Sequence, residues 1–402
     1  MATPALDDVF RREWPRLVTV VARITGDLAL AEDAVQEAFA RAAAARDREI
    51  LINPAAWLTT VAKRIAIDAV RREARLAERL PLLAVEEPPA AVDAAGDDRL
   101  ALLFAVCTPA LEADARLALA LRFVCGVPTA EIAAVLLVTH PAMSARLTRA
   151  KRRIADQHVR FTVPAGPELA ARLPDVLTTV HLLYTVGHTA AEGADLRSAD
   201  ITSTAVELAR ALRVLAPADL EVAGLAALLL LTEARAPGRV RADGSIASLE
   251  VADRATWDAA LVGEGLDLAT TALAGSGRFA LEAGISGLHS SARTFAETDW
   301  AAICRLYDRL VERWPSPAAE VARLVARSFL PGQAADSLAA LGALEQRAPA
   351  AGRQIAAARA DLLRRMQRVE EARAAYAAAR SVERNAAVRD FYGARITELE
   401  QR

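Results

Sequence analysis

The segment from Pro141 to Ile154 combines one apolar stripe with a dense set of basic side chains. Its apolar residues recur at i, i+4, i+7 and i+11, which is the spacing of one helical face: Met143, Leu147, Ala150 and Ile154. The rest of the helix surface carries Ser144, Arg146, Arg149, Lys151, Arg152 and Arg153. Such a helix can pack one face on a core while the other neutralises phosphates, which is the chemistry of nucleic-acid binding.

A short helix is expected before this basic helix. Thr129 is the predicted N-cap of a helix that runs through Leu137, and the chain breaks at 138–141 because a residue before proline avoids the helical region. Two helices joined by a brief turn form a helix-turn-helix, whose second helix enters the major groove of DNA. A solvated basic helix in an ordinary bundle would carry the same charges. The short first helix and the brief turn favour the helix-turn-helix.

A second basic stripe lies on the helix expected from Pro54 to Arg79, with Asn53 as its N-cap. The stripe holds Arg64, Asp68, Arg71 and Arg75, flanked by Lys63 and Arg72. A basic stripe with Trp57 nearby suits melted or single-stranded DNA, where charge and bases are both accessible. A solvated charged face fits the composition equally well, and Trp57 can equally be a core residue.

An acidic and polar face is expected on the helix that Asp27 caps. It is formed by Glu32, Asp33, Gln36 and Glu37, while Val35, Phe39 and Ala42 point the other way. On physical grounds alone, a solvated surface is the favoured interpretation of this face.

These segments belong to helices throughout the chain. Residues 9–46 show helical periodicity for two helices, and residues 100–154 are helical again. Between them, residues 81–98 hold three prolines, five acids and no basic residue, which indicates a linker. A second boundary falls at 163–167, and helices punctuated by glycine and proline follow. Residues 332–338 and 367–373 show the same turn-into-helix step at an offset near the tetratricopeptide period, although Ala-rich hairpins can give the same pattern.

Composition excludes several classes of protein. The chain has 402 residues, 53% apolar but only 4% aromatic, which predicts several helix-rich domains, and its net charge of −2 argues against indiscriminate coating of nucleic acid. Its three cysteines and five histidines form no disulfide or zinc pattern, and no nucleotide-binding or hydrolase motif is present, so no enzyme, metal or cofactor is expected. No apolar run approaches about 18 residues and no signal peptide opens the chain, which predicts a cytoplasmic protein without a membrane segment.

Three of the segments, in this order and spacing, resemble a known family. They are residues 31–39, residues 57–58 with 67–72, and residues 131–133 followed by 146–151. Together they resemble regions 2 and 4 of the extracytoplasmic-function (ECF) sigma factors of the sigma-70 superfamily. The runs at 253–258, 298–308 and 360–365 are similar to the subgroup that carries a long, tetratricopeptide-like C-terminal extension.

The resemblance implies an all-α fold in four parts. These are a region 2 helical bundle at 1–80, an acidic linker at 81–99, region 4 with its helix-turn-helix at 100–163, and a helical, tetratricopeptide-like extension at 164–402. A protein partner of the extension, or its packing on regions 2 and 4, would make it regulatory.

The resemblance also implies partners for each face. Core RNA polymerase would meet region 4 through its β flap, and its β′ clamp helices would bind Asp33, Gln36, Glu37 and Phe39 in place of the solvated surface favoured above. The minus-10 promoter element would be bound by Lys63, Arg64, Asp68, Arg71 and Arg72, with a flipped base captured by residues 46–53. The minus-35 element would be bound by His140, Ser144, Arg146, Arg149, Lys151 and Arg152. The linker acids would occupy the positively charged path of the template and the RNA.

Three functions are therefore weighed for the chain. A promoter-specificity subunit explains two DNA-facing segments separated by an acidic linker. An autonomous helix-turn-helix regulator with a sensing or partner-binding C-terminal half would instead bind duplex DNA by itself. A helical scaffold with incidental basic helices would show no dependence on DNA.

Overall fold

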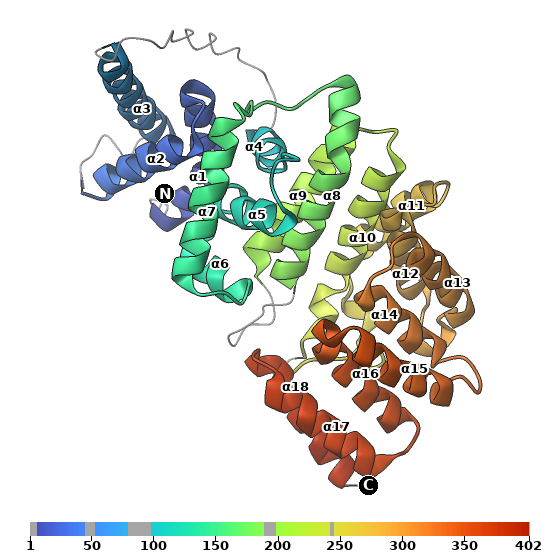
Figure 1. Cartoon of the computed structure of the whole chain (residues 1–402). Helices are drawn as coiled ribbons and strands as arrows, with labels where there is room; N and C mark the ends of the chain where they lie inside the picture. The colour runs from blue at the N-terminus through green and yellow to red at the C-terminus, as the bar shows by residue number, and fades with distance from the viewer. Residues whose placement is uncertain (1–5, 45–52, 79–97, 189–197, 242–244, 402) are drawn as a thin grey trace. The chain divides into compact units, whose positions relative to one another are not determined.

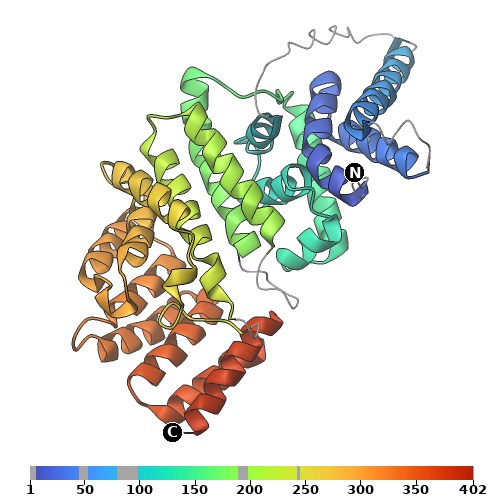
Figure 2. The same ribbon diagram turned by 180° about the vertical axis from the view of Figure 1, so that it is seen from behind.

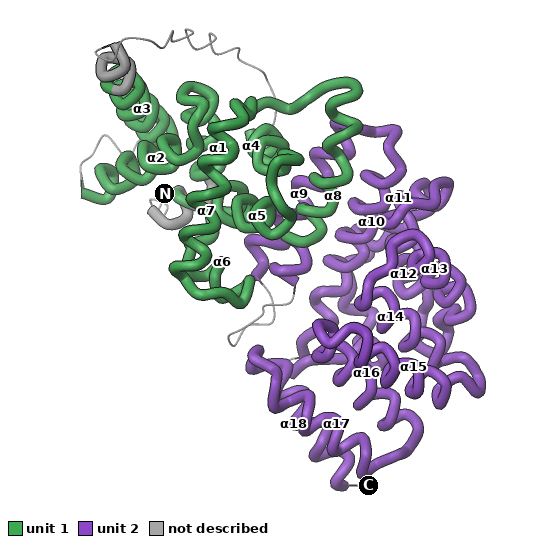
Figure 3. Tube along the Cα trace, in the orientation of Figure 1, with its two compact units in different colours: residues 1–183 green, residues 184–402 purple. Residues whose placement is uncertain are grey.

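The computed structural model describes residues 6–44, 53–78, 98–188, 198–241 and 245–401 (Figure 1). Most of these residues are helical, and the only strand-like pairing among them is an isolated antiparallel bridge between Val240 and Ile246. The predicted all-α class is confirmed. The chain divides into two compact units, residues 1–183 and residues 184–402 (Figure 3).

Unit 1 begins with three helices that pack on one another, α1 (Leu6–Thr25), α2 (Leu28–Ala44) and α3 (Pro54–Glu78). Their shared core buries Trp14, Val35 and Leu58 completely. Asp27 caps α2 as predicted, because its Oδ1 accepts hydrogen bonds from the backbone N–H groups of residues 29 and 30 at 2.6 and 3.2 Å. Asn53 caps α3 as predicted, accepting from residue 56 at 3.1 Å.

The second half of unit 1 contains α4 (Asp98–Val106), α5 (Ala113–Leu119) with a π-helical turn at Ala120–Val124, α6 (Thr129–Val135), α7 (His140–Asp156) and most of α8 (Gly166–His188). Helices α6 and α7 pack together as the predicted helix-turn-helix, and Leu137 adopts a left-handed φ of 55° in the turn. The predicted cap at Thr129 is wrong. Extended Pro128 holds the N-cap position without a side-chain bond, and Thr129 already lies in the first turn.

The start of α7 also differs by one residue from the prediction. The helix begins at His140 rather than at Pro141, because Thr139 holds the N-cap and its Oγ1 accepts from the N–H of Ala142 at 3.4 Å. Proline then occupies the first turn, where its missing N–H costs nothing. The predicted buried stripe is confirmed for all four residues, Met143, Leu147, Ala150 and Ile154.

Unit 2 is a succession of helices in which neighbours along the chain pack on one another (Figures 1 and 2). They are α9 (Ala199–Leu215), α10 (Leu220–Ala234), α11 (Ala259–Ala272), α12 (Arg278–Ser291), α13 (Trp300–Arg313), α14 (Pro317–Arg327), α15 (Ala334–Arg347), α16 (Gly352–Arg365), α17 (Val369–Val382) and α18 (Ala386–Glu400). Short 3-10 turns lie at Ala236–Arg239, Arg254–Thr256, Phe295–Glu297 and Pro349–Ala351.

The two repeated steps noted in the sequence have the same local structure. Gly332 precedes α15 with φ of 74°, and Gln367, 35 residues later, precedes α17 with φ of 58°. Both helices are thus preceded by a residue in the left-handed conformation.

Close packing of α10 on α12 depends on a glycine. A Cβ at Gly224 would lie 2.5 Å from the carbonyl carbon of Phe279, so only glycine fits this crossing. On the same helix, Glu221 accepts hydrogen bonds from the N–H groups of Phe279 and Ala280 at 3.0 Å each, which caps α12 from outside. No helix of the described residues is long and apolar enough to cross a membrane.

Candidate nucleic-acid and polymerase interface

The basic face of α3 is open to solvent. All five residues predicted for the minus-10 element are exposed, namely Lys63, Arg64, Asp68, Arg71 and Arg72. They stand opposite the buried Leu58, Ala62 and Ala66, which face the other helices of the bundle. Trp57 is half-buried at the edge between the two faces. The segment predicted to capture a flipped base, 46–53, lies outside the described residues except for Asn53.

The predicted minus-35 residues of α7 fall into two groups. His140, Arg149 and Arg152 are exposed, and Ser144 is half-buried. Arg146 and Lys151 instead have carboxylate partners. The guanidinium of Arg146 lies 3.4 Å from the exposed carboxylate of Asp114, whereas Lys151 forms a shorter and less exposed pair.

Lys151 binds Glu32 of α2 in a largely buried ion cluster. Its Nζ donates to Glu32 Oε2 at 2.8 Å, and the guanidinium of Arg122 donates to Glu32 Oε1 at 2.7 Å. The three side chains are only 11–17% exposed. Arg122 also lies over the ring of Trp14, at 4.9 Å from its centroid. We call Glu32, Arg122 and Lys151 the Glu32 cluster; it joins the N-terminal bundle to the helix-turn-helix.

A second ion pair joins the same two halves of unit 1. The Nη1 of Arg23 on α1 lies 2.7 Å from Asp98 at the start of α4, and its Nε donates to the carbonyl of Phe161 at 2.9 Å. Asp98 is one of the five acids of the predicted linker, and the structure places it in this pair at the N-terminus of a helix, where negative charge is favoured. The other four lie outside the described residues.

The predicted polymerase-binding residues of α2 do not share one face. Asp33, Gln36 and Glu37 are exposed, and Glu37 pairs with Arg41 at 2.8 Å on the same helix. Phe39 is only 7% exposed and packs against the ring of Phe10 at 4.9 Å. The prediction that this face is solvated is wrong for Glu32, which is buried in the Glu32 cluster. It fits Asp33, Gln36 and Glu37, which are exposed.

Sequence reasoning missed Arg122. This residue lies in a run of otherwise apolar side chains at 117–124 that is buried around it. A charged residue in such a run needs an ionic partner, and that signal is visible in the sequence. The sequence does not reveal which residue is the partner, because Glu32 lies 90 residues earlier.

Three segments of the chain match known protein families. The sequence matches the family described as Sigma-70 region 2 over residues 9–76, the family described as Sigma-70, region 4 over residues 102–154, and a family of unknown function, DUF6596, over residues 172–273. The first two matches cover most of α1–α3 and most of α4–α7, and the third lies in the first part of the extension.

Two relatives are similar over longer stretches. An uncharacterized protein of Rhizobium meliloti is 38% identical over 326 residues, which are 78% of this chain and 77% of that protein. The ECF RNA polymerase sigma factor SigJ of Mycobacterium tuberculosis is 35% identical over 187 residues, 42% of this chain and 59% of SigJ. No solved structure matches the chain.

A helical bundle with an exposed basic face, followed by a helix-turn-helix and matched by both region families, defines a sigma factor of the sigma-70 type. The chain carries region 2 and region 4 of this type, followed by a long, helical C-terminal extension that begins with the DUF6596 segment, and it is similar to an ECF sigma factor.

Proposed function

We propose that this sigma factor binds core RNA polymerase, directs it to promoters with minus-10 and minus-35 elements, and assists melting of the minus-10 segment. The observation that carries the proposal is the presence of two exposed basic helix faces, on α3 and on α7, in segments matched by regions 2 and 4. Each face offers arginine and lysine to phosphates and bases, with its opposite side anchored in a core.

The exposure of the side chains supports a division of roles on α7. His140, Arg149 and Arg152 are positioned to contact the minus-35 element, with Ser144 and Arg146 beside them. Lys151 is engaged by Glu32, so its role in the free protein is to hold α7 against α2. DNA contact by Lys151 would require the cluster to open.

The polymerase contacts are assigned to exposed residues in the same way. Asp33, Gln36 and Glu37 form a surface of α2 that suits the β′ clamp helices, and Phe39 supports it from below through its contact with Phe10. Region 4 would bind the β flap. We assign residues 1–80 to region 2, 81–99 to the linker, 100–163 to region 4, and 164–402 to a regulatory domain that receives a protein partner or acts within the chain.

Reconstitution tests the proposal directly. Full-length protein is mixed with bacterial core polymerase, and run-off transcription is measured from promoters upstream of its own gene. We expect transcription that depends on the protein and falls when Arg149→Ala and Arg152→Ala are combined. The control is Arg293→Ala, which removes an arginine that is 88% exposed in unit 2 and should leave transcription unchanged. Failure to bind core polymerase, under conditions where a known sigma factor binds, rejects the proposal.

The helix-turn-helix geometry of α6 and α7 by itself also suits an autonomous regulator. That alternative predicts tight binding of duplex DNA without polymerase, with an affinity that falls as salt rises. The sigma factor proposal predicts weak binding by the free protein. Fluorescence anisotropy with a labelled promoter duplex, with and without core polymerase, separates the two.

A further inference from the structure

A cavity of about 550 Å³ lies within unit 2. Its walls come from Arg239, the segment at 246–250, the end of α12, helices α13 and α14, and helices α16 to α18. This volume falls within the roughly 300–1,000 Å³ of small-molecule sites. None of the functions assigned above uses the cavity.

The walls are unusually rich in aromatic side chains. Seven of the 20 lining residues are aromatic, whereas aromatic residues make up 4% of the whole chain. Trp300 and Phe329 are stacked with ring centroids 4.0 Å apart and planes at 12°, and Phe295 meets both rings edge-on at 5.4 Å. The guanidinium of Arg365 lies 3.8 Å from the centroid of Phe329. Stacked and edge-on contacts of this kind fix the rings in place.

The last two helices add further aromatic rings to the lining. Tyr376 of α17 and Tyr392 of α18 are buried, with centroids 5.9 Å apart, and Phe391 is half-buried beside Tyr392. Phe295, Trp300, Tyr307 and Phe329 are likewise only half-buried. The protein therefore leaves apolar ring surface uncovered within one cavity, and a ligand that covered it would gain about 25 cal/mol for each Å² removed from water.

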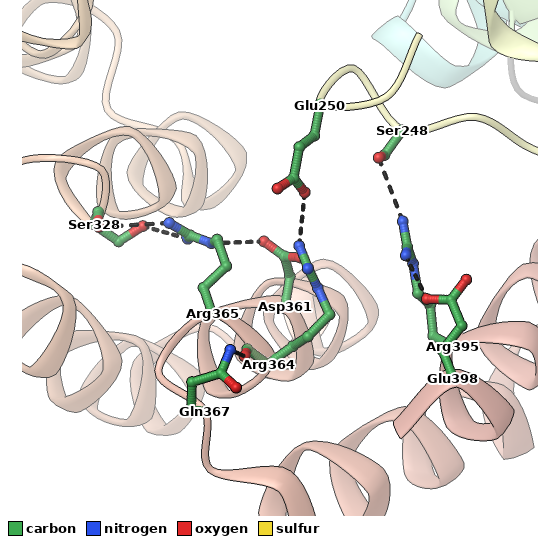
Figure 4. Close-up of polar contacts among 9 residues, drawn as sticks. All are labelled: Ser248, Glu250, Ser328, Asp361, Arg364, Arg365, Gln367, Arg395 and Glu398. Atoms are coloured by element: carbon green, nitrogen blue, oxygen red, sulfur yellow. Dashed lines mark hydrogen bonds and ion pairs between the residues drawn. The ribbon is translucent and has the colours of Figure 1, made fainter. Parts of the chain in front are cut away.

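The charged residues that line the cavity already have protein partners (Figure 4). Asp361 accepts from Arg364 at 2.9 Å and from Arg365 at 3.0 Å, and Glu250 accepts from Arg364 at 2.8 Å. Arg395 is paired with Glu398 at 2.7 Å. These bonds, with the 3.4 Å contact between Arg395 and Ser248, also fix the segment at 245–250 as one wall.

The lining is consequently close to neutral. Arg239 and Arg395 balance Glu250 and Asp361, and burial together with Arg235 and Arg254 lowers the pKa of His289 to about 4, so its imidazole is uncharged at pH 7. A peptide would need partners for its many backbone N–H and C=O groups, whereas Glu250, Asp361 and Arg395 are already engaged and the lining offers one buried polar atom without a partner, Nδ1 of His289. A neutral, flat ligand has no such requirement.

We propose that the C-terminal unit of this sigma factor binds one small, planar, uncharged aromatic molecule in the cavity between the Trp300–Phe329 stack and the rings of α17 and α18. The site is assembled from sequence runs that the promoter-binding function leaves unused, since Trp300 and Tyr307 lie in the run at 298–308 and Asp361 in the run at 360–365.

The test uses full-length protein and the neutral fluorescent probe N-phenyl-1-naphthylamine. Fluorescence should rise and saturate at one probe per chain. Ala357→Phe places a ring in the cavity and is expected to weaken binding by about tenfold or more, equivalent to about 1.4 kcal/mol. Ala377→Phe adds the same ring to an exposed position of α17 and should bind the probe like the natural sequence.

A second substitution controls for the case in which Ala357→Phe weakens binding by disturbing the fold. Phe391→Ala removes one wall without adding bulk and should also weaken binding, while circular dichroism reports whether the helices are retained. Binding without saturation, or equal binding by the Ala357→Phe and Ala377→Phe variants, overturns the proposal. Tighter binding of the sulfonated probe 1-anilinonaphthalene-8-sulfonate would show that the site selects an anion, and would overturn the assignment of an uncharged ligand.

Discussion

Two groups of arginine side chains, one in each unit, have opposite surroundings. On α3 and α7 of unit 1, Arg71, Arg149 and Arg152 are exposed and face away from the core. In unit 2, Arg364 and Arg365 are 14% and 17% exposed and bind carboxylates around an aromatic cavity. An exposed guanidinium remains available to a polyanion, whereas a buried one with partners fixes the protein around it. The residue type is the same in both groups. The exposed arginines are available for binding, whereas the buried ones hold the fold around the cavity together.

Unit 1 also holds largely buried ion pairs, and among them disruption of the Glu32 cluster should have the largest effect. Glu32→Gln removes the carboxylate from a site where Arg122 and Lys151 remain largely buried, which is expected to cost about 3–5 kcal/mol. Hydrogen exchange of the α7 backbone, followed by mass spectrometry, should accelerate because this helix loses its tie to α2.

The matched control for this substitution lies on the same helix. Glu37→Gln breaks only the exposed pair with Arg41, whose side chains are 50% and 56% exposed, so a change of about 0–1 kcal/mol is expected. Equal and small effects of the two substitutions on α7 exchange would show that the cluster does not hold the helix.

Packing of α10 on α12 offers the corresponding test in unit 2. Gly224→Ala forces a Cβ against the backbone of Phe279 and should destabilise the unit by about 1–3 kcal/mol. Gly342→Ala on α15 meets no atom within 4 Å and should be neutral or stabilising by about 0.5–1 kcal/mol. Urea denaturation followed by circular dichroism measures both, and a loss of stability in the Gly342 variant would contradict the geometric reason given for Gly224.

These tests also separate what the sequence can predict from what it cannot. The buried stripe of α7 and the caps at Asp27 and Asn53 are local patterns, and the structure confirms them. The burial of Glu32 depends on a partner 90 residues away, and the cavity depends on rings brought together from distant helices. Neither arrangement leaves a periodic signal, because each is set by packing among separate elements.

His289 should make unit 2 less stable in mild acid. Burial, with repulsion from Arg235 and Arg254, lowers the pKa of His289 to about 4, below its unfolded value of 6.5. The unfolded chain therefore binds a proton first as pH falls, and stability should decline from pH 6.5 towards pH 4, by up to about 2 kcal/mol at pH 5.

Substitution isolates this histidine from the other groups that titrate in acid. His289→Phe keeps an aromatic ring against Trp300, which His289 meets edge-on at 5.3 Å, and should flatten the pH dependence of the unfolding free energy between pH 7 and pH 5. An identical slope in the variant and the natural sequence would mean that His289 is not the group responsible.

Substitution of an exposed arginine should have the smallest effect on stability among these changes and a clear effect on DNA binding. Arg71→Ala removes a side chain with no buried surroundings on α3, so the unfolding free energy should change by no more than about 0.5 kcal/mol. Binding of the polymerase complex to a single-stranded minus-10 oligonucleotide should nevertheless weaken, and the slope of log affinity against log salt should fall by about 0.7 if one phosphate contact is lost. Arg293→Ala also removes an exposed arginine but lies in unit 2, so it should leave both quantities unchanged. An Arg71 variant that binds the oligonucleotide with the natural salt slope would assign this face of α3 to solvent rather than to DNA.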